Sequence, residues 1–386
     1  MDLCLVMIGR FEERNGDYYG DKKNINAIER YLRYFDTIYV VARQTDSNSS
    51  IYPRQKIDCK NGRISFSLYK EMKGLKDFSR YLSDFKNKLS SSVIKCDMVL
   101  CWAETKTKLI LKLAKKHKKP VMVYVGGCNR DILFSSKSLI RKMAGIWVYY
   151  DNKCAIKNAD YVHYVTNSVL QKRYPTNGKY IGASYVKINT AISEKYLENR
   201  IGRYDKLEKF TLGIIGYLNE VKGIDTAIYA LSHLDSRFCL RILGGGDPSY
   251  YKSMARKLGI EERVIFEGTI LPGEPVLNWL DKIDLYLQPS RTEGLPRATI
   301  EAMSTGCPII STNVMGLKEL TEREWIHRPG DWKELARLII DLSSNPDELK
   351  KQSKRSFQVA KRYNRDLLDE RIDSFFKGII QKVEKK

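Results

Sequence analysis

The sequence has few of the residues that build metal sites and disulfide frameworks. Four of its 386 residues are histidine, and its eight cysteines are dispersed, with no Cys-x-x-Cys spacing. Dispersed cysteines are typical of buried thiols in a reducing compartment, which argues against both a disulfide-stapled domain and a zinc site. We therefore expect no protein-bound metal and no cofactor of the protein's own.

Long apolar runs are also absent. No stretch approaches the roughly eighteen apolar residues that a membrane-spanning helix needs. The apolar segment from Leu3 to Gly9 is followed by Arg10, Glu12 and Glu13, which is unlike the apolar core and cleavage site of a signal peptide. The expected location is the cytoplasm.

The length predicts two domains, because 386 residues exceed what one hydrophobic core usually covers. The polar connection from Ser193 to Lys209, rich in Glu, Lys and Arg, sets the expected boundary and gives residues 1–195 and 196–364. Residues 365–386 read as one helix, because their apolar side chains fall on one side of it.

Both halves alternate short apolar runs with stretches of helical period. This alternation predicts an α/β protein in which each half is a doubly wound parallel sheet with right-handed crossovers. The expected strands lie at residues 3–9, 37–42, 98–102, 121–125 and 161–166 in the first half, and at 210–216, 240–243, 264–268, 284–287 and 308–310 in the second.

The most informative segment runs from Pro289 to Pro308. Within it, Glu293 and Glu301 stand eight residues apart, the first in a glycine-containing turn and the second about one turn inside a helix. Turn amides and helix starts attract anions, while carboxylates accept hydrogen bonds from vicinal hydroxyls. The segment follows an expected strand, and open parallel sheets bind ligands at the carboxyl ends of their strands. This layout suits a sugar and a ribose beside a phosphate.

The segment resembles the glutamate-x7-glutamate signature of retaining family-four glycosyltransferases, and the residues around the two glutamates match nearly position for position. The resemblance implies the GT-B architecture, with two Rossmann-like domains facing across a cleft and a last helix that crosses back to the first domain. It implies that the first domain binds an acceptor and the second a nucleotide-diphosphate sugar. It also implies transfer of a hexosyl unit, with retention, to a glycan or polyprenyl-diphosphate-linked acceptor in bacterial surface-polysaccharide assembly, without a metal.

The resemblance extends to the strand that ends at Gly216. In the family this glycine lets the donor diphosphate approach the backbone, and a lysine at the position of Lys222 neutralises it. The family usually has arginine where this chain has Tyr217. The expected replacements for that missing cation are Arg291 and Arg297.

The same resemblance assigns the other donor contacts. Glu293 would hold the hydroxyls of the donor sugar and Glu301 the ribose. The amides of Gly294 and Leu295 would stabilise the leaving diphosphate, and the loop from Thr269 through Ile270 to Leu271 would lie near the base. Separately, the glycines at 244–246 do not fit the spaced-glycine dinucleotide fingerprint, which disfavours a dehydrogenase.

The acceptor side is less clearly marked. Residues 10–23 are expected to form a long first loop in which Gly16 and Asp17 either line the acceptor cleft or form a surface turn. Near the start of another helix, Gly127 and Asn129 are expected to face the cleft. Asp131 either contacts the sugar, as a catalytic-cleft residue does in the family, or caps that helix.

His163 alternates with apolar residues on an expected strand. This pattern favours a core histidine with satisfied hydrogen bonds over a catalytic base.

The charge is strongly one-sided, with 67 Lys and Arg against 46 Asp and Glu, a net charge of +21. Such a chain attracts polyanions, including nucleic acid, anionic lipid and diphosphates. The stretch from Leu139 to Val148 combines basic and apolar residues as an interfacial helix does, so we expect peripheral attachment to an anionic inner leaflet. A solvated basic face is the alternative. Nucleic-acid binding is disfavoured, because aromatics are not interleaved with the basic runs. A nucleotide-sugar epimerase of GT-B fold is the other enzymatic alternative, although the sequence shows no acid and base pair for it.

Overall fold

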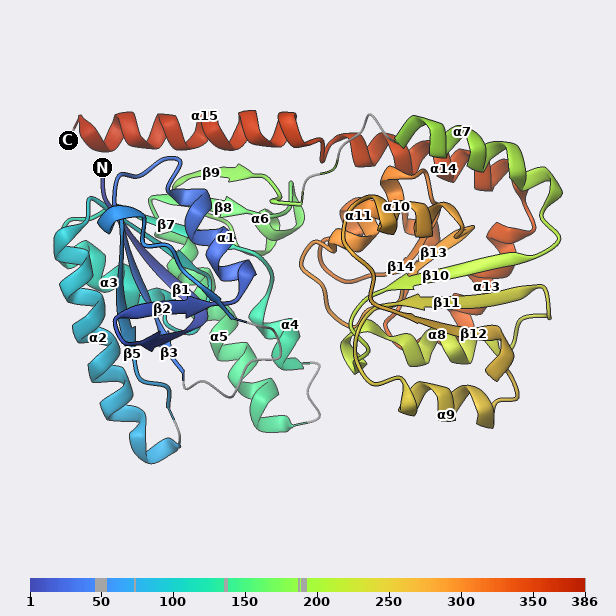
Figure 1. Cartoon of the computed structure of the whole chain (residues 1–386), viewed down its shortest axis with the longest axis horizontal. Coiled ribbons are helices and arrows are strands. Elements are labelled where there is room, and N and C mark those ends of the chain that lie inside the picture. Colours follow the sequence, from blue (N-terminus) through green and yellow to red (C-terminus); the bar gives the residue numbers. More distant parts are fainter. Residues whose placement is uncertain (46–53, 73, 135–137, 187, 189–192, 386) are drawn as a thin grey trace.

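The computed structural model of the protein describes residues 1–45, 54–72, 74–134, 138–186, 188 and 193–385. The chain folds into two α/β halves placed side by side, with one long helix, α15 (Arg365–Glu384), lying over the first half (Figure 1). This arrangement is the GT-B architecture expected from the sequence, including the last helix that crosses back.

The amino-terminal half is built on a parallel sheet whose central strand is β1 (Leu3–Arg14). Along this strand Leu3 and Leu5 face one hydrophobic core while Cys4 and Val6 face another, as the two-residue period of a strand requires. Helices on both faces bury this sheet, which explains its nearly continuous apolar strands. The parallel order is β5 (Ile64–Tyr69), β3 (Ile38–Gln44), β1, β6 (Met98–Trp102), β7 (Val121–Val125), β8 (Tyr161–Tyr164) and β9 (Lys179–Gly182).

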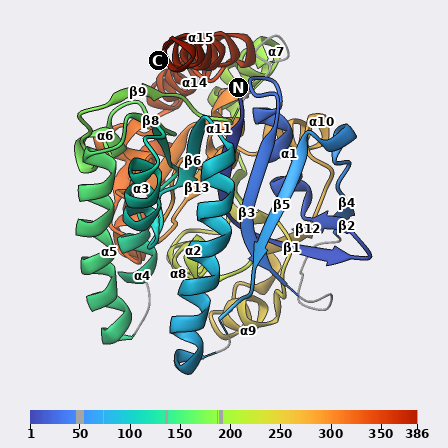
Figure 2. The ribbon, with the colours of Figure 1, turned by 90° about the vertical axis from the view of Figure 1, so that its left-hand side faces the viewer.

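Helices cover this sheet on both sides (Figure 2). One side carries α1 together with α15, and the other carries α2, α3 and α5. The helices of this half are α1 (Lys22–Tyr31), α2 (Phe78–Lys95), α3 (Thr107–Lys116), α4 (Asn129–Phe134), α5 (Leu139–Lys157) and α6 (Val169–Arg173).

The carboxy-terminal half repeats the plan with a second parallel sheet. On β13 (Leu285–Gln288), Leu285 and Leu287 face the core beneath α8, α9 and α13, whereas Tyr286 faces α10, α11 and α14. The strand order is β12 (Val264–Gly268), β11 (Phe238–Leu243), β10 (Phe210–Ile215), β13, β14 (Ile309–Thr312) and β15 (Ile326–His327). The order reverses direction between β10 and β13, which is where open α/β sheets place ligands.

The helices of the second half share one role, which is to cover the two faces of this sheet and its edge. They are α7 (Ser193–Arg203), α8 (Ile224–Leu231), α9 (Ser249–Lys257), α10 (Glu274–Asp281), α11 (Arg297–Ser304), α12 (Leu317–Leu320), α13 (Trp332–Ser343) and α14 (Pro346–Lys361).

The first strand corrects one expectation. Residues 10–23 do not form a long loop, because β1 continues to Arg14 and turns back into β2 (Asp17–Gly20), which pairs with β4 (Gln55–Lys56). Phe11 is fully buried, which gives the extension an apolar anchor. Asn15 and Gly16 have φ values of 51° and 83°, the left-handed pair that a tight hairpin turn uses.

The segment expected as a polar connection is largely helical. Helix α7 packs on the carboxy-terminal half, and the expected boundary between residues 195 and 196 falls inside its first turn. The guanidinium of Arg200 is fully buried and donates to the carbonyls of Leu280 (2.8 Å), Thr305 (3.1 Å) and Ile283. Although this segment is rich in Lys, Arg and Glu, Arg200 is buried in it, because carbonyls at helix ends need hydrogen-bond donors.

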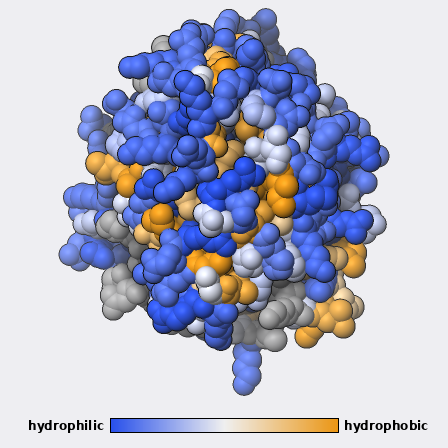
Figure 3. All heavy atoms as spheres, turned by 90° about the vertical axis from the view of Figure 1, so that its right-hand side faces the viewer, coloured by the Kyte–Doolittle hydropathy of each residue, from blue (hydrophilic) through white to orange (hydrophobic). Residues whose placement is uncertain are grey.

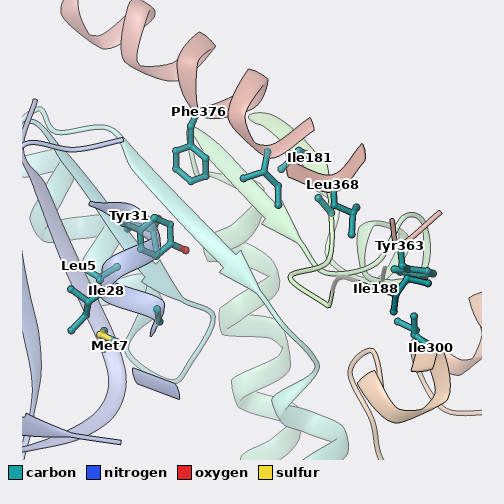
Figure 4. Packing of buried hydrophobic residues seen from close by; sticks show 14 of the residues in the cluster. Leu5, Met7, Ile28, Tyr31, Ile181, Ile188, Ile300, Tyr363, Leu368 and Phe376 are labelled. Atoms are coloured by element: carbon teal, nitrogen blue, oxygen red, sulfur yellow. The ribbon is translucent and has the colours of Figure 1, made fainter. Parts of the chain in front are cut away.

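Helix α15 is held to the first half mainly by aromatic packing. Phe376 is fully buried and stacks on Tyr34, with ring centroids 4.5 Å apart, while Tyr31 meets it edge-on at 5.8 Å. Figure 4 shows apolar side chains following the helix to Leu368 and then to Tyr363, which lies between α14 and α15. The apolar core is therefore continuous between the halves along this edge.

The two places where the chain passes between the halves are joined to each other. Ile188 donates its N–H to the Tyr363 carbonyl (3.0 Å) and accepts from the Arg365 N–H (3.1 Å). Asn364 caps α15 by accepting from the amides of Asp366 and Leu367. The helical break between α14 and α15 is therefore fixed by the other crossing segment.

The helices, the cysteines and the outer surface agree with a protein that has no membrane-spanning helix in its described part. Within the described part of the chain, no helix has the length and hydrophobicity needed to cross a bilayer. All eight cysteines are free, and five of them are buried. The outer face of the second half is mostly hydrophilic, with small separate hydrophobic patches (Figure 3).

Candidate active site

Glycines line the carboxyl ends of β10 and β11. A Cβ on Gly244 would lie 1.9 Å from the Gly216 carbonyl oxygen, and one on Gly245 would lie 3.2 Å from the Thr269 methyl. These positions therefore keep three loops in close contact and leave bare backbone facing outward. Gly216 and Thr269, both expected near the donor, belong to this one surface.

Lys222 lies across this surface. Its aliphatic stem passes about 3 Å from where a Cβ on Gly216 would be. The next residue, Gly223, has a φ of 66°, and a Cβ there would lie 2.0 Å from the Pro289 carbonyl oxygen. A glycine is thus required for the Lys222 turn to pack against the loop that carries Glu293.

Glu293 is fixed by a polar network. Its Oε1 accepts from Lys222 Nζ (2.6 Å), Ser290 Oγ (2.9 Å) and Gln288 Nε2 (3.3 Å). The side chains of Lys222 and Glu293 are 24% and 12% exposed, so the pair is at the edge of solvent. All three described bonds go to Oε1, which leaves Oε2 for a further donor.

A second layer orients this network. Gln288 Oε1 accepts from Thr299 Oγ1 (2.9 Å) and the Tyr286 hydroxyl (3.0 Å), and all three residues are buried. Burial raises the pKa of Tyr286, so its hydroxyl remains a donor. The sequence reasoning missed Gln288, Ser290, Thr299 and Tyr286. The period-two spacing of Tyr286, Gln288 and Ser290, leading toward Glu293, is the signal that indicates them.

Of the three cations expected at the donor site, Lys222 bonds to Glu293, and the two arginines have carboxylate partners of their own. Arg291 forms a two-pronged ion pair with Asp225 (2.6 and 2.9 Å), and this hydrogen bonding raises the pKa of Arg291. Arg297, which is 62% exposed, donates to Glu301 Oε1 at 2.8 Å. Both arginines proposed to replace the cation missing at Tyr217 therefore carry carboxylate partners.

The two halves meet at glycines. A Cβ on Gly294 would lie 2.3 Å from the Gly126 carbonyl oxygen, and one on Gly127 would lie 3.8 Å from the Gly294 Cα. On its other side, Gly294 accepts at its carbonyl from the Gly316 N–H (2.9 Å). The loop that holds Glu293, Gly294 and Leu295 is therefore wedged between the amino-terminal half and the β14–α12 turn.

On the amino-terminal side, Asp131 binds Arg173 of α6. Its Oδ1 accepts from Arg173 Nη2 (2.7 Å) and lies 3.5 Å from Arg130 Nε. Asn129 donates to the Ala103 carbonyl (3.0 Å). Asp131 is the third residue of α4, and the contacts described for its carboxylate go to Arg173 and Arg130. Its contact with the sugar stays a prediction.

A carboxylate of the second half caps a helix of the first. Glu319 accepts from the amides of Asn167 (2.9 Å), Ser168 (2.7 Å) and Val169 (2.7 Å), and from the Ser168 hydroxyl (3.0 Å). These amides begin α6, so a negative charge is favourable there. Glu319 therefore forms a polar link between the halves beside the cleft.

His163 is a core residue, as the sequence indicated. It is fully buried, with Nε2 2.7 Å from the Ala183 carbonyl oxygen and Nδ1 3.3 Å from the Tyr185 hydroxyl. Burial lowers its pKa to about 4. It is therefore neutral at ordinary pH and its nitrogens are occupied.

Other expected residues lie at the periphery. Gly16 and Asp17 occupy the β1–β2 hairpin, where Asp17 accepts from Lys56 (2.6 Å). Ile270 is 38% exposed, next to Thr269. These placements leave the acceptor role of the hairpin and the base-binding role of the β12 loop as predictions.

Two cavities lie between the halves, on the flanks of the Glu293 loop. One, of about 160 Å³, is lined by Arg130, Asp131, Arg173, Arg291 and Lys318 among others. The other, of about 230 Å³, is lined by Tyr124, Gly126, Tyr185, Leu295 and Arg297 among others. In the described residues, no group of three His, Cys, Asp or Glu side chains is arranged to hold a metal, and metal independence stays a prediction.

The two Rossmann-like sheets and the site between them define a GT-B protein, and the likeness to solved structures agrees. The chain superposes on Anabaena Alr3699/HepE in complex with UDP with a TM-score of 0.68 and 14% identity, covering 98% of this chain and 100% of that one. A structure of the same protein with UDP-glucose gives a TM-score of 0.62 and 15% identity, covering 97% and 99%.

Sequence comparison gives the family. The model described as "Glycosyl transferases group 1" matches residues 198–359. Protein CapJ of Staphylococcus aureus is 31% identical over 346 residues, covering 88% of this chain and 85% of CapJ. The amylovoran biosynthesis glycosyltransferase AmsK of Erwinia amylovora is 33% identical over 142 residues, covering 33% of this chain and 35% of AmsK. The chain belongs to the group 1 glycosyltransferases.

Proposed function

We propose that the protein is a retaining glycosyltransferase that moves a hexosyl unit from a nucleotide-diphosphate sugar to a glycan or lipid-linked acceptor during surface-polysaccharide assembly. The observation that carries this proposal is the position of Glu293. Its carboxylate is held by Lys222, Ser290 and Gln288, next to the glycine Gly294 that touches Gly126 of the other half.

The donor fits this geometry by charge and shape. The diphosphate would lie over Gly216, beside Lys222 and the amides of Gly294 and Leu295, where backbone can approach it closely. Glu293 Oε2 would accept from hydroxyls of the sugar, and Glu301 would accept from the ribose. HepE, whose fold this chain shares, has been seen with UDP and with UDP-glucose, which supports a nucleotide-sugar donor.

The reaction would proceed on one face of the sugar. The bond from the anomeric carbon to the diphosphate oxygen breaks, the acceptor oxygen bonds to that carbon from the same side, and the acceptor proton passes to the departing diphosphate. Positive charge at Lys222 and the loop amides would stabilise charge as it develops on the leaving group, which is often the largest contribution to enzymatic rate. No side-chain nucleophile is needed.

The polysaccharide context rests on relatives. AmsK is described as an amylovoran biosynthesis glycosyltransferase, and it matches this chain over 142 residues. Because the chain belongs to a glycosyltransferase family, its charge alone no longer supports nucleic-acid binding, and transfer is favoured over epimerisation.

The test uses purified protein and a panel of UDP- and GDP-sugars. One nucleotide sugar should raise the melting temperature, because a ligand that binds only the folded state stabilises it. Transfer to a lipid-linked glycan should then give a product whose anomeric configuration, read by NMR, matches the donor. An inverted product would contradict the retaining mechanism, and absence of any nucleotide binding would contradict the donor assignment.

We also propose peripheral attachment of the amino-terminal half to an anionic inner leaflet. Helix α5 presents an apolar stripe to solvent along its first turns, which a folded domain rarely leaves exposed. The exposed residues are Leu139 (72%), Ile140 (80%), Met143 (64%), Ile146 (48%), Trp147 (62%) and Tyr150 (63%).

Basic residues accompany this stripe. Arg141 is exposed on the same helix, Lys142 lies beside it half-buried, and the net charge of the chain is +21. Lys137, just before the helix, is outside the described residues. Interfacial helices bind membranes by inserting apolar side chains and by attracting anionic lipid headgroups with basic residues.

Vesicle co-sedimentation tests the attachment. The double variant Ile140→Glu/Trp147→Glu should lose binding to vesicles containing phosphatidylglycerol. Tyr250→Glu is the matched control, because Tyr250 is 65% exposed on α9 of the other half. Binding that is equal in all three proteins, or independent of salt, would refute the attachment through α5.

A further inference from the structure

The cavity between α4, α6 and α12 has an excess of cations, and of these only Arg291 was expected at the donor site. Arg130, Arg173, Arg291 and Lys318 line it, against one lining carboxylate, Asp131. Arg291 is paired with Asp225 behind the wall. Arg130 and Arg173 both contact Asp131, and Lys318 also lines the cavity, so three cations face one lining carboxylate and the cavity is positive.

Two donor atoms in this cavity lack a good hydrogen-bond acceptor, although both guanidinium groups lie over the Tyr149 ring. Arg130 Nε is buried and makes no hydrogen bond within the described residues, although Asp131 lies 3.5 Å away. Arg173 Nη1 points at the sulfur of Met315 (3.0 Å), which is a weak acceptor for a charged donor. Buried donors without good acceptors are costly, and their presence indicates a missing partner. A group with several anionic oxygens would satisfy both guanidinium groups.

The position of the cavity indicates which molecule would carry that anionic group. Thr292, which lines it, is adjacent in sequence to Glu293, so an anion here would sit beside the transfer site on the flank away from Arg297 and Leu295. Arg130 belongs to α4, whose Phe134 packs against Gly145 of α5. The guanidinium of Arg130 also lies over the Tyr149 ring of α5, 5.2 Å from its centroid, so the cavity adjoins the helix with the exposed apolar stripe.

We infer that this cavity binds the diphosphate of a lipid-linked acceptor, with Arg130, Arg173 and Lys318 as its ligands. The inference rests on the proposed function. It assigns the diphosphate to a place between the apolar stripe on α5, where the lipid would lie, and Glu293, where the accepting sugar must reach. Both halves supply cations, so the acceptor would be bound only when the halves are together.

The test compares charge-matched variants. Arg130→Gln/Lys318→Gln removes two cavity cations, and Lys354→Gln/Lys377→Gln removes two exposed lysines elsewhere. The probes are inorganic pyrophosphate, farnesyl diphosphate and UDP, titrated by calorimetry into each protein and into Lys222→Gln. Farnesyl diphosphate should bind the parent protein about tenfold more tightly than pyrophosphate, because the prenyl chain adds apolar contact.

The expected pattern separates the two anion sites. The cavity variant should bind farnesyl diphosphate about tenfold or more weakly while binding UDP as the parent does, and the lysine control should bind both unchanged. Lys222→Gln should show the reverse, with UDP weakened. Unchanged farnesyl diphosphate binding in the cavity variant would overturn the inference. So would a matching loss of UDP binding, which would place the cavity in the donor site, or equal affinity for pyrophosphate and farnesyl diphosphate, which would remove the lipid. A parent protein that binds no nucleotide would refute the proposed function instead.

Discussion

The two sides of the cleft are assembled differently. On the carboxy-terminal side, Lys222 and Glu293 bond directly to each other, and a buried layer of side chains from the same half fixes them. On the amino-terminal side, Asn129 and Asp131 are held by their own neighbours. Contacts with the other half include Arg173 with Met315, Gly126 with Gly294, and the amides at the start of α6 with Glu319. The side proposed to bind the donor is thus organised largely within one half, whereas the side proposed to bind the acceptor depends on how the halves are placed.

The largest expected effect breaks the donor side alone. Glu293→Ala should lower the transfer rate by about 10³-fold, since it removes the group proposed to hold the donor sugar and leaves Lys222 without its partner. The melting temperature should change little, because the pair is at the edge of solvent. Steady-state kinetics and thermal unfolding measure the two.

Glu301→Ala is the comparison for that variant. It should mainly weaken donor binding, raising KM with a smaller change in kcat, because Glu301 is assigned to the ribose. Equal activity of either variant and the parent protein would contradict the assignment.

The next largest effect is expected on α15, the helix that joins the second half to the first. Phe376→Ala should cost about 3–5 kcal/mol in unfolding free energy, as expected for a fully buried phenylalanine. Phe375→Ala is the matched control, because its ring is only partly buried. Urea unfolding of both should show the larger loss for Phe376. Similar losses would mean that α15 is not held by this ring.

A pH series tests the core beneath the acceptor side. The folded pKa of His163 is lowered to about 4, below the ordinary 6.5, so the unfolded chain takes up its proton first as pH falls. This group therefore costs stability as pH falls from 6.5 toward 4, on the order of 3 kcal/mol in full. In His163→Gln that part of the pH dependence should vanish. Parallel stability curves for the two proteins would show that the histidine is not buried in its neutral form.

The smallest expected effect concerns the polar link between the halves. Glu319→Gln keeps the shape but removes the charge that three amides of α6 share, and it should cost about 1–3 kcal/mol. Glu324→Gln, at an exposed site on the same half, serves as the control. Thermal unfolding gives the cost, and small-angle scattering should show a larger radius only for Glu319→Gln. An unchanged radius would mean that α15 alone sets the spacing of the halves.

That Lys222 and Glu293 come together could be predicted, because the determinants are local, while their donor-binding roles stay predictions. Gly216 and Lys222 lie in one strand and the turn after it, and Glu293 and Glu301 lie in one loop and the helix after it. Within each pair, the number of residues between the two therefore sets their distance in the fold. The buried layer behind Glu293 was not predicted, because Gln288 and Thr299 look like ordinary strand and helix residues until they are packed against each other.

Two polar segments, one in each half, were predicted less well for a physical reason. The polar residues from Arg10 onward read as a loop, yet Phe11 packs into the core and the Asn15 and Gly16 turn closes a hairpin. The polar stretch after Ser193 read as a connection, yet the buried Arg200 anchors it as a helix. In both places the charged composition predicted an irregular segment, because Phe11 and Arg200 are buried by residues that are distant in the chain.

The sequence by itself determined the two-domain α/β fold, the parallel strands and the glutamate-bearing loop, because hydrophobic period and short motifs act over neighbouring residues. Only the tertiary structure decided that Gly294 touches Gly126, that Glu319 caps α6, and that Arg130, Arg173 and Lys318 share one cavity. Those contacts join residues far apart in the chain, and α15 and the paired crossing segments hold the halves where the contacts form.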